Sequence, residues 1–114
     1  MSRKWGSFDT EVTNRELEAI PYPDRGALYQ AMAAYAEDLD IRYSVKNYGD
    51  DLMMLKASNG TSGRCLFFSR ERIGDSEKLV ALLFYKKESE EAPKRVIEAA
   101  RARMIEYRKK EKPA

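Results

Sequence analysis

The sequence contains no histidine, a single cysteine and no long hydrophobic segment. Among the 114 residues Cys65 is the only cysteine, which excludes an internal disulfide and makes a cysteine-based metal site implausible. We expect it to be a small buried strand residue. The lack of histidine removes the commonest metal ligand and the base of histidine-containing triads. Neither a metal nor a cofactor is therefore predicted, and any catalysis has to use lysine, arginine, tyrosine, serine or acidic side chains.

The apolar residues are too dispersed to form a membrane-spanning helix. The longest apolar run covers residues 79–85, whereas a span needs roughly 20 apolar residues. The N-terminus begins with basic residues and continues into Gly6 and Ser7 without an apolar stretch, so no secretory signal is predicted. We therefore expect a cytoplasmic protein without membrane contact, folded as one domain over residues 1–114.

Charge is distributed unevenly along the chain. The formal net charge is +2, but residues 1–50 carry six lysines and arginines against nine acidic residues, and residues 51–114 carry fifteen against ten. The second half therefore holds an excess of positive charge. Clustered lysine and arginine side chains are the groups that contact phosphates, so this distribution points to an anionic partner such as a nucleic acid.

The first half of the sequence predicts one strand and two helices. Residues 4–12 are expected to form the strand. Thr13 or Asn14 is expected to cap a short helix, which the prolines in residues 21–23 bring to an end. Asp24 is expected to cap the second helix. The apolar stripe of that helix is predicted at Leu28, Met32, Tyr35 and Leu39.

Three strands are expected in the second half, because short apolar segments alternate there with turn residues. The last of these strands is apolar on both faces, as a central strand covered on both sides would be. The predicted strands are residues 52–57, 64–68 and 78–86, and the predicted turns and loops are residues 47–51, 59–63 and 70–77.

A terminal helix is expected after Ser89, with Pro93 near its first turn. The elements then follow in the order β-α-α-β-β-β-α. This order predicts an α+β fold: a small antiparallel sheet with a mixed edge, two N-terminal helices and one C-terminal helix. The apolar face of the terminal helix is predicted to consist of Val96, Ile97, Ala100, Met104 and Tyr107.

Three stretches of the second half resemble the RelE/ParE toxin superfamily, and in particular its HigB-like, phage-derived branch. Residues 52–56 stand where members show a Leu-x-Glu-Leu-Arg strand, and residues 64–68 stand where they show an aromatic-Arg-Ile-x-Tyr strand. The third stretch comprises residues 79–87 and, after a short acidic gap, residues 92–100. It looks like the family's apolar strand with its Phe-x-Lys-Lys, followed by the Pro-containing start of the last helix. The N-terminal half agrees in element order and length.

The resemblance implies a RelE-like fold and the toxin of a type II toxin–antitoxin system. Such a toxin is a ribosome-dependent endoribonuclease, or mRNA interferase, which cuts messenger RNA and thereby inhibits translation. It implies two kinds of partner: the ribosome with its message, and a cognate antitoxin that an adjacent gene encodes.

The resemblance and strand alternation together select the candidate site residues. Arg64 is expected to stabilise the charge that develops at the scissile phosphate, with support from Lys56 and Lys86. If the faces of the three strands coincide, these side chains converge at one end of the sheet. Tyr85 is a candidate for proton transfer. RNA binding through phosphates is assigned to Lys87, Lys94, Arg95 and Arg101.

Each candidate also has an ordinary structural interpretation. Lys56 and Lys86 suit solvated strand ends, Arg64 suits a loop ion pair, and Tyr85 suits the core. Because Arg64 opens a predicted strand, its replacement by alanine is expected to cost no more than about 1 kcal/mol of stability. Tyr107 is expected to pack rather than to react.

The sequence departs from the family pattern at four positions. Met54 replaces the usual acidic residue, Lys56 replaces an arginine, Gly63 replaces an aromatic residue, and Leu82 stands where many relatives have histidine. A lysine lacks the bidentate fork of arginine, so Lys56 is not an equivalent replacement. These departures leave two alternatives open: a ParE-like inhibitor of DNA gyrase, and a non-catalytic, degenerate toxin that only binds its antitoxin.

Overall fold

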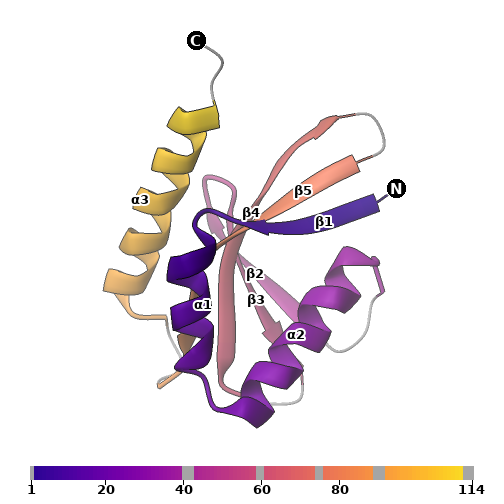
Figure 1. The fold of residues 1–114 in the computed structure, drawn as a ribbon, viewed down its shortest axis with the longest axis vertical. Helices are drawn as coiled ribbons and strands as arrows, with labels where there is room; N and C mark the ends of the chain where they lie inside the picture. Colours follow the sequence, from indigo (N-terminus) through magenta and orange to yellow (C-terminus); the bar gives the residue numbers. More distant parts are fainter. Residues whose placement is uncertain (1, 40–42, 59–60, 74–75, 89–91, 112–114) are drawn as a thin grey trace.

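In the computed structural model a first strand is followed by two helices, four successive strands and a terminal helix (Figure 1). The structure describes residues 2–39, 43–58, 61–73, 76–88 and 92–111. Its elements are β1 (Ser2–Ser7), α1 (Thr10–Glu18), α2 (Tyr22–Ala36), β2 (Tyr43–Gly49), β3 (Leu52–Ala57), β4 (Gly63–Ile73), β5 (Ser76–Lys86) and α3 (Lys94–Glu111).

The strands form one mixed sheet in the order β1-β5-β4-β3-β2. β1 runs parallel to β5, whereas all other neighbours in the sheet are antiparallel. The predicted α+β class, with its mixed edge, two N-terminal helices and one C-terminal helix, is confirmed. β2 has no counterpart among the predicted strands. It is an edge strand whose side chains are mostly exposed, so it lacks the apolar alternation that marks a half-buried strand.

Helices cover both faces of the sheet and create two cores. Figure 1 shows α3 on one side of the sheet and α2 on the other. Burial of each large apolar side chain in such a core contributes about 1.5–3 kcal/mol. The α2-side core includes Leu17, Leu28, Leu55, Cys65, Phe67 and Phe84. The α3-side core includes Met54, Leu66, Phe68, Leu82, Leu83 and Met104.

The first helix starts earlier than predicted, because Asp9 caps it in place of Thr13 or Asn14. The carboxylate of Asp9 accepts hydrogen bonds from the backbone N–H groups of Glu11 and Val12. These are two of the N–H groups that a helix start leaves without partners. The predicted strand 4–12 is correspondingly shorter, and Thr13 is a buried residue inside α1.

The second helix also starts before its predicted cap, Asp24. α2 begins at Tyr22, because Pro23 is tolerated in the first helical turn, where backbone N–H groups have no partner within the helix. The helix ends at Ala36. Leu39 lies beyond that end and is 45% exposed, so it does not belong to the predicted apolar stripe.

The hairpin between β4 and β5 is longer than predicted. Residues 70–77 were expected to form a loop, but Ile73 of β4 pairs with Ser76 of β5. Residues 74–75 lie outside the described residues, as do residues 59–60 of the predicted turn 59–63. The terminal helix begins at Lys94, so Pro93 lies at its first turn as predicted, and the carbonyl of Pro93 accepts hydrogen bonds from Val96 and Ile97.

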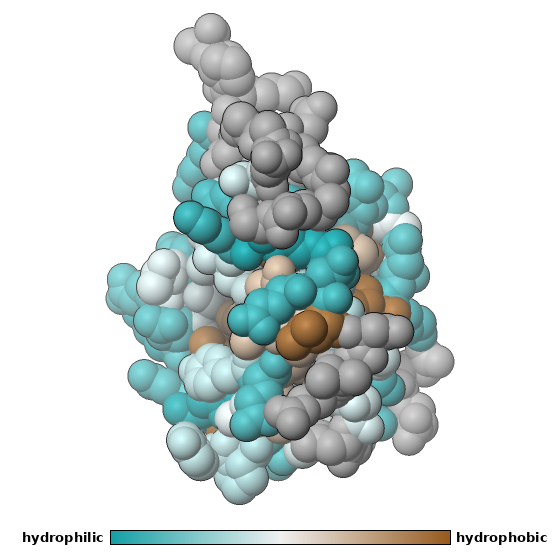
Figure 2. Space-filling view, turned by 90° about the vertical axis from the view of Figure 1, so that its right-hand side faces the viewer, coloured by the Kyte–Doolittle hydropathy of each residue, from teal (hydrophilic) through white to brown (hydrophobic). Residues whose placement is uncertain are grey.

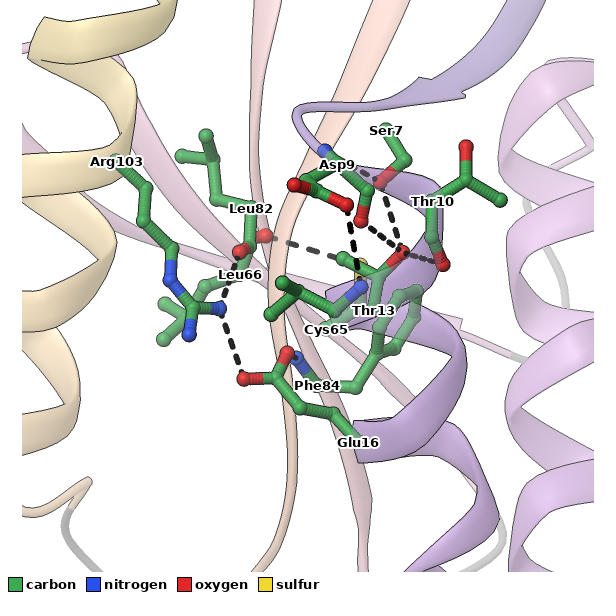
Figure 3. Close-up of polar contacts among 11 residues, drawn as sticks. Ser7, Asp9, Thr10, Thr13, Glu16, Cys65, Leu66, Leu82, Phe84 and Arg103 are labelled. Atoms are coloured by element: carbon green, nitrogen blue, oxygen red, sulfur yellow. Dashed lines mark hydrogen bonds and ion pairs between the residues drawn. The ribbon is translucent and has the colours of Figure 1, made fainter.

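An ion pair closes the edge of β5 where β1 no longer covers it. β1 ends at its pairing with Ala81, which leaves backbone groups of the next β5 residues without a neighbouring strand. Glu16 of α1 accepts a hydrogen bond from the N–H of Phe84 at 3.1 Å, and Arg103 of α3 donates to the carbonyl of Leu82 at 2.8 Å. Arg103 and Glu16 also pair with each other at 2.8 Å (Figure 3). Two side chains thus satisfy the backbone groups that another strand would otherwise bind.

The outer surface is largely polar where it can be seen. In the face shown in Figure 2, hydrophobic residues form small areas among mostly hydrophilic ones. In the part of the chain that the structure describes, no helix has the length and apolar character needed to cross a membrane.

Replacing Arg103 with alanine should reduce the free energy of unfolding by about 2–3 kcal/mol, because it removes bonds to a carboxylate and to a backbone carbonyl. Glu16→Gln should cost less, since the amide oxygen still accepts from Phe84. Urea unfolding would measure both changes. Arg95→Ala, an exposed arginine of the same helix, is the control and should change stability by less than about 0.5 kcal/mol. Equal losses for Arg103 and Arg95 would contradict the proposed role of the pair.

Candidate functional site

A β-bulge in β5 decides which side chains share a face of the sheet. Leu66 pairs with Leu83 and Phe67 pairs with Ala81, so Leu82 is an extra residue in β5. Leu82 and Leu83 both belong to the α3-side core. Alternation therefore restarts one residue later, and every β5 side chain after the bulge points to the face opposite to that expected from simple alternation.

Three of the four predicted catalytic residues lie in one row on the α3 side of the sheet. Lys56 pairs with Ser44 of β2 and with Arg64 of β4, and Arg64 pairs with Tyr85 of β5. Directly paired residues of antiparallel strands carry their side chains on the same face. The structure thus brings Lys56, Arg64 and Tyr85 together.

Lys86 lies on the other face of the sheet. It pairs with Gly63, where an added side chain would contact the backbone of Asp24 in α2. Hydrogen bonds from Ser62 lower the pKa of Asp24, and the positive charge of Lys86 adds to this lowering. The prediction that Lys86 converges with the other basic residues is therefore wrong, because it assumed regular alternation through the bulge.

A pocket of about 240 Å³ lies beside the row. Four of its eight lining residues are lysine or arginine, and none of the eight is acidic. Within the described ranges, no group of three or more histidine, cysteine, aspartate and glutamate side chains is arranged to hold a metal ion. A lining with this excess of positive charge favours an anionic ligand. The lining residues are Ser44, Val45, Lys46, Tyr48, Met54, Lys56, Arg64 and Lys87.

Arg64 is buried, with 5% of its surface exposed, although it stands at the start of β4. Its Nη1 donates hydrogen bonds to the carbonyl oxygens of Thr61 at 2.7 Å and Gly63 at 2.9 Å. The guanidinium therefore holds the chain that leads into β4 while it also lines the pocket. The expectation that Arg64 is an exposed residue at the start of a strand is wrong, because the side chain folds back over its own backbone.

Tyr85 is half-buried next to the pocket. Its hydroxyl donates a hydrogen bond to the sulfur of Met54 at 3.4 Å, and the hydroxyl of Tyr48 lies 4.0 Å from the same sulfur. Burial raises the pKa of Tyr85 above its ordinary value; Tyr48 raises the pKa further, whereas Arg64 lowers it. Tyr85 therefore keeps its proton at neutral pH and can act as a hydrogen-bond or proton donor.

Arg101, predicted to bind RNA, holds the turn between β2 and β3. It donates to the carbonyls of Tyr48 at 2.7 Å and Gly49 at 3.3 Å, and it pairs with Asp50 at 3.3 Å. Asp50 and Asp51 have φ values of 52° and 74°, a conformation that is costly for residues with a side chain. Bonds from Arg101 offset part of that cost.

The other predicted RNA contacts are divided between the pocket and α3. Lys87 follows β5 and lines the pocket. Lys94 and Arg95 are exposed in the first turn of α3, where Lys94 lies 3.9 Å from Glu98. Such an exposed ion pair is worth less than about 1 kcal/mol, so Lys94 can exchange it for another anion.

β2 supplies pocket residues that the sequence interpretation missed. Ser44, Lys46 and Tyr48 line the pocket, and Lys46 Nζ lies 5.0 Å from the centre of the Tyr48 ring. The sequence signal for β2 is limited to Tyr43 and Val45 in alternation with polar residues, which is too short a pattern to mark a half-buried strand. The pocket therefore contains a basic residue, Lys46, that was not among the predicted site residues.

Arg64→Ala should lower the free energy of unfolding by about 1–3 kcal/mol, because it removes charge-assisted bonds to two backbone carbonyls. Chemical denaturation would measure the loss. Lys56→Ala, its neighbour in the row, should cost less, since Lys56 is more exposed. A loss for Arg64→Ala below about 0.5 kcal/mol would show that these bonds contribute little.

The raised pKa of Tyr85 also predicts a pH dependence of stability. The folded state keeps the tyrosine proton at a pH where the unfolded chain begins to lose it, near the ordinary pKa of about 10. The contribution of Tyr85 to the free energy of unfolding is thus complete below that pH and declines above it. The stability difference between wild type and Tyr85→Phe should fall between about pH 9 and pH 11 in urea unfolding. A difference that stays constant over this range would contradict the shift.

Comparison with known proteins gives no family for this chain. No protein-family model matches the sequence, and no curated protein matches it at a significant level. The resemblance of residues 52–100 to the RelE/ParE superfamily therefore stays a prediction, and the function is inferred from the pocket and its charges.

Proposed function

We propose that the protein is the toxin of a type II toxin–antitoxin pair and acts in the cytoplasm as a metal-independent endoribonuclease on messenger RNA at the ribosome. The cationic pocket is its active site. The observation that supports this most directly is the pocket lining, in which four of eight residues are basic and none is acidic. A nuclease that works without a metal needs such charges to stabilise the phosphorane.

The roles of the row residues follow from the chemistry of RNA cleavage. Attack by the ribose 2′-oxygen forms an O2′–P bond and breaks the P–O5′ bond, which gives a 2′,3′-cyclic phosphate and a free 5′-hydroxyl. Lys56 and Arg64, paired on neighbouring strands, stabilise the charge on the non-bridging oxygens. Tyr85 donates its proton to the departing 5′-oxygen, while the proton of the 2′-hydroxyl leaves to solvent.

The remaining cations bind the RNA on either side of the scissile phosphate. Lys46 and Lys87 line the pocket together with Lys56 and Arg64. Lys94 and Arg95, which are exposed in the first turn of α3, bind further phosphates of the RNA. An antitoxin encoded by an adjacent gene would cover this face, and acidic segments would suit it by charge.

Lys56→Ala should reduce messenger cleavage by roughly 100-fold and relieve growth arrest, because a preorganised charge donor is lost. Lys86→Ala is the matched control, since it removes a lysine at a strand end on the opposite face of the sheet. Growth and fragments of messenger RNA would be recorded together after induced expression, and the fragments should carry 5′-hydroxyl ends. Equal loss of activity in both variants would exclude the pocket as the site.

Binding can be separated from cleavage by its dependence on salt. For a short single-stranded RNA, each phosphate contact contributes about 0.7 to the slope of log affinity against log salt. Lys87→Ala should reduce that slope, whereas Lys86→Ala should leave it unchanged. Growth arrest with intact messages and altered DNA supercoiling would identify a gyrase inhibitor, and absence of both arrest and cleavage would identify a non-catalytic protein.

A further inference from the structure

Met54 places a thioether in the wall of the cationic pocket. The side chain is 8% exposed and lines the pocket, and it stands in β3 between Lys46 of β2 and Leu66 of β4. Among the methionines that the structure describes, Met32 and Met53 pack against the α2-side core on the other face, and Met104 lies within the α3-side core. Of the methionines in the described residues, Met54 is thus the one that an oxidant entering the pocket would contact.

Two hydroxyl groups converge on the sulfur of Met54. The Tyr85 hydroxyl donates to it at 3.4 Å, and the Tyr48 hydroxyl lies 4.0 Å away. Oxidation of a thioether by a peroxide requires a proton for the oxygen that leaves, and a neighbouring hydroxyl can supply it. The pocket wall therefore holds a nucleophilic sulfur with two proton donors beside it: Tyr48, which also lines the pocket, and Tyr85, which lies next to it.

We propose that Met54 is a site of reversible oxidation by hydrogen peroxide, and that its sulfoxide weakens anion binding in the pocket. The sulfur lone pair attacks one peroxide oxygen, the O–O bond breaks, and the departing oxygen takes a proton from Tyr85 and leaves as water. The S–OH⁺ group that remains loses its proton to solvent, and Tyr85 is reprotonated from solvent. The sulfur is oxidised by two electrons and the peroxide is reduced.

The sulfoxide changes the pocket in two ways. Its oxygen is a strong hydrogen-bond acceptor, so it competes with the ligand for the hydroxyl of Tyr85. It also places the negative end of a dipole beside Lys56 and Arg64, which line the same pocket. Loss of such charge-assisted contacts should weaken binding by about tenfold or more. The effect on RNA rests on the proposed function, whereas the oxidation itself does not.

The first experiment maps the oxidation and needs no nuclease activity. The intact protein would be treated with increasing hydrogen peroxide, and sulfoxide at each methionine would be measured by peptide mass spectrometry with fragment spectra that separate Met53 from Met54. Met54 should be oxidised faster than Met104, which is buried in the same core. Oxidation of Met54 no faster than that of Met104 would overturn the proposal.

The second experiment tests the consequence with matched variants. Affinity for a short single-stranded RNA would be measured before and after peroxide for wild type, Met54→Leu and Met53→Leu. Peroxide should lower the affinity about tenfold or more for wild type and for Met53→Leu, and it should leave the affinity of Met54→Leu nearly unchanged. Treatment of the oxidised wild type with methionine sulfoxide reductase and a thiol should restore its affinity.

The outcomes separate this inference from the proposed function. An equal loss of affinity in Met54→Leu and wild type would overturn the regulatory role of Met54. If no RNA binds to any untreated variant, the proposed function fails and with it the regulatory role, while the oxidation site is judged by the mass spectrometry alone.

Discussion

The extra residue in β5 determines the composition of the site. A strand that must be apolar on both faces can accept a bulge only where two consecutive side chains fit one core, and Leu82 and Leu83 meet that condition. The bulge turns Tyr85 into the row of Arg64 and turns Lys86 towards α2. The phenol of Tyr85 thereby lies beside the guanidinium of Arg64. The positive charge of Lys86 instead helps to lower the pKa of Asp24 in α2.

The ion pair at the edge of β5 fixes the strand just after this bulge. Glu16 holds the N–H of Phe84, the residue before Tyr85, and Arg103 holds the carbonyl of Leu82, the extra residue. One helix from each end of the chain is thus attached to the segment that orients the tyrosine. Correct placement of Tyr85 depends on contacts between elements that are far apart in the sequence, and no local pattern encodes such contacts.

The parts of the fold that depend on local patterns were predictable, and those that depend on pairing were not. The apolar strands, the start of α3 after Pro93 and the α+β class follow from composition and periodicity. Which face of the sheet carries Lys86 depends on the bulge at Leu82 and Leu83, and two leucines within an apolar run give no sign of a bulge. Burial of Arg64 depends on its backbone acceptors, and β2 is too exposed to show an apolar pattern. The row of Lys56 and Arg64 was predictable, whereas the contribution of Lys46 to the pocket was not.

The turn between β2 and β3 illustrates how a site can be maintained while its sequence varies. Arg101 recognises main-chain oxygens at Tyr48 and Gly49, and every amino acid carries such an oxygen. The side chain at position 48 would be free to vary as far as this contact is concerned. A pocket wall attached in this way can acquire new side chains, and hence a new ligand preference, without losing its attachment to α3.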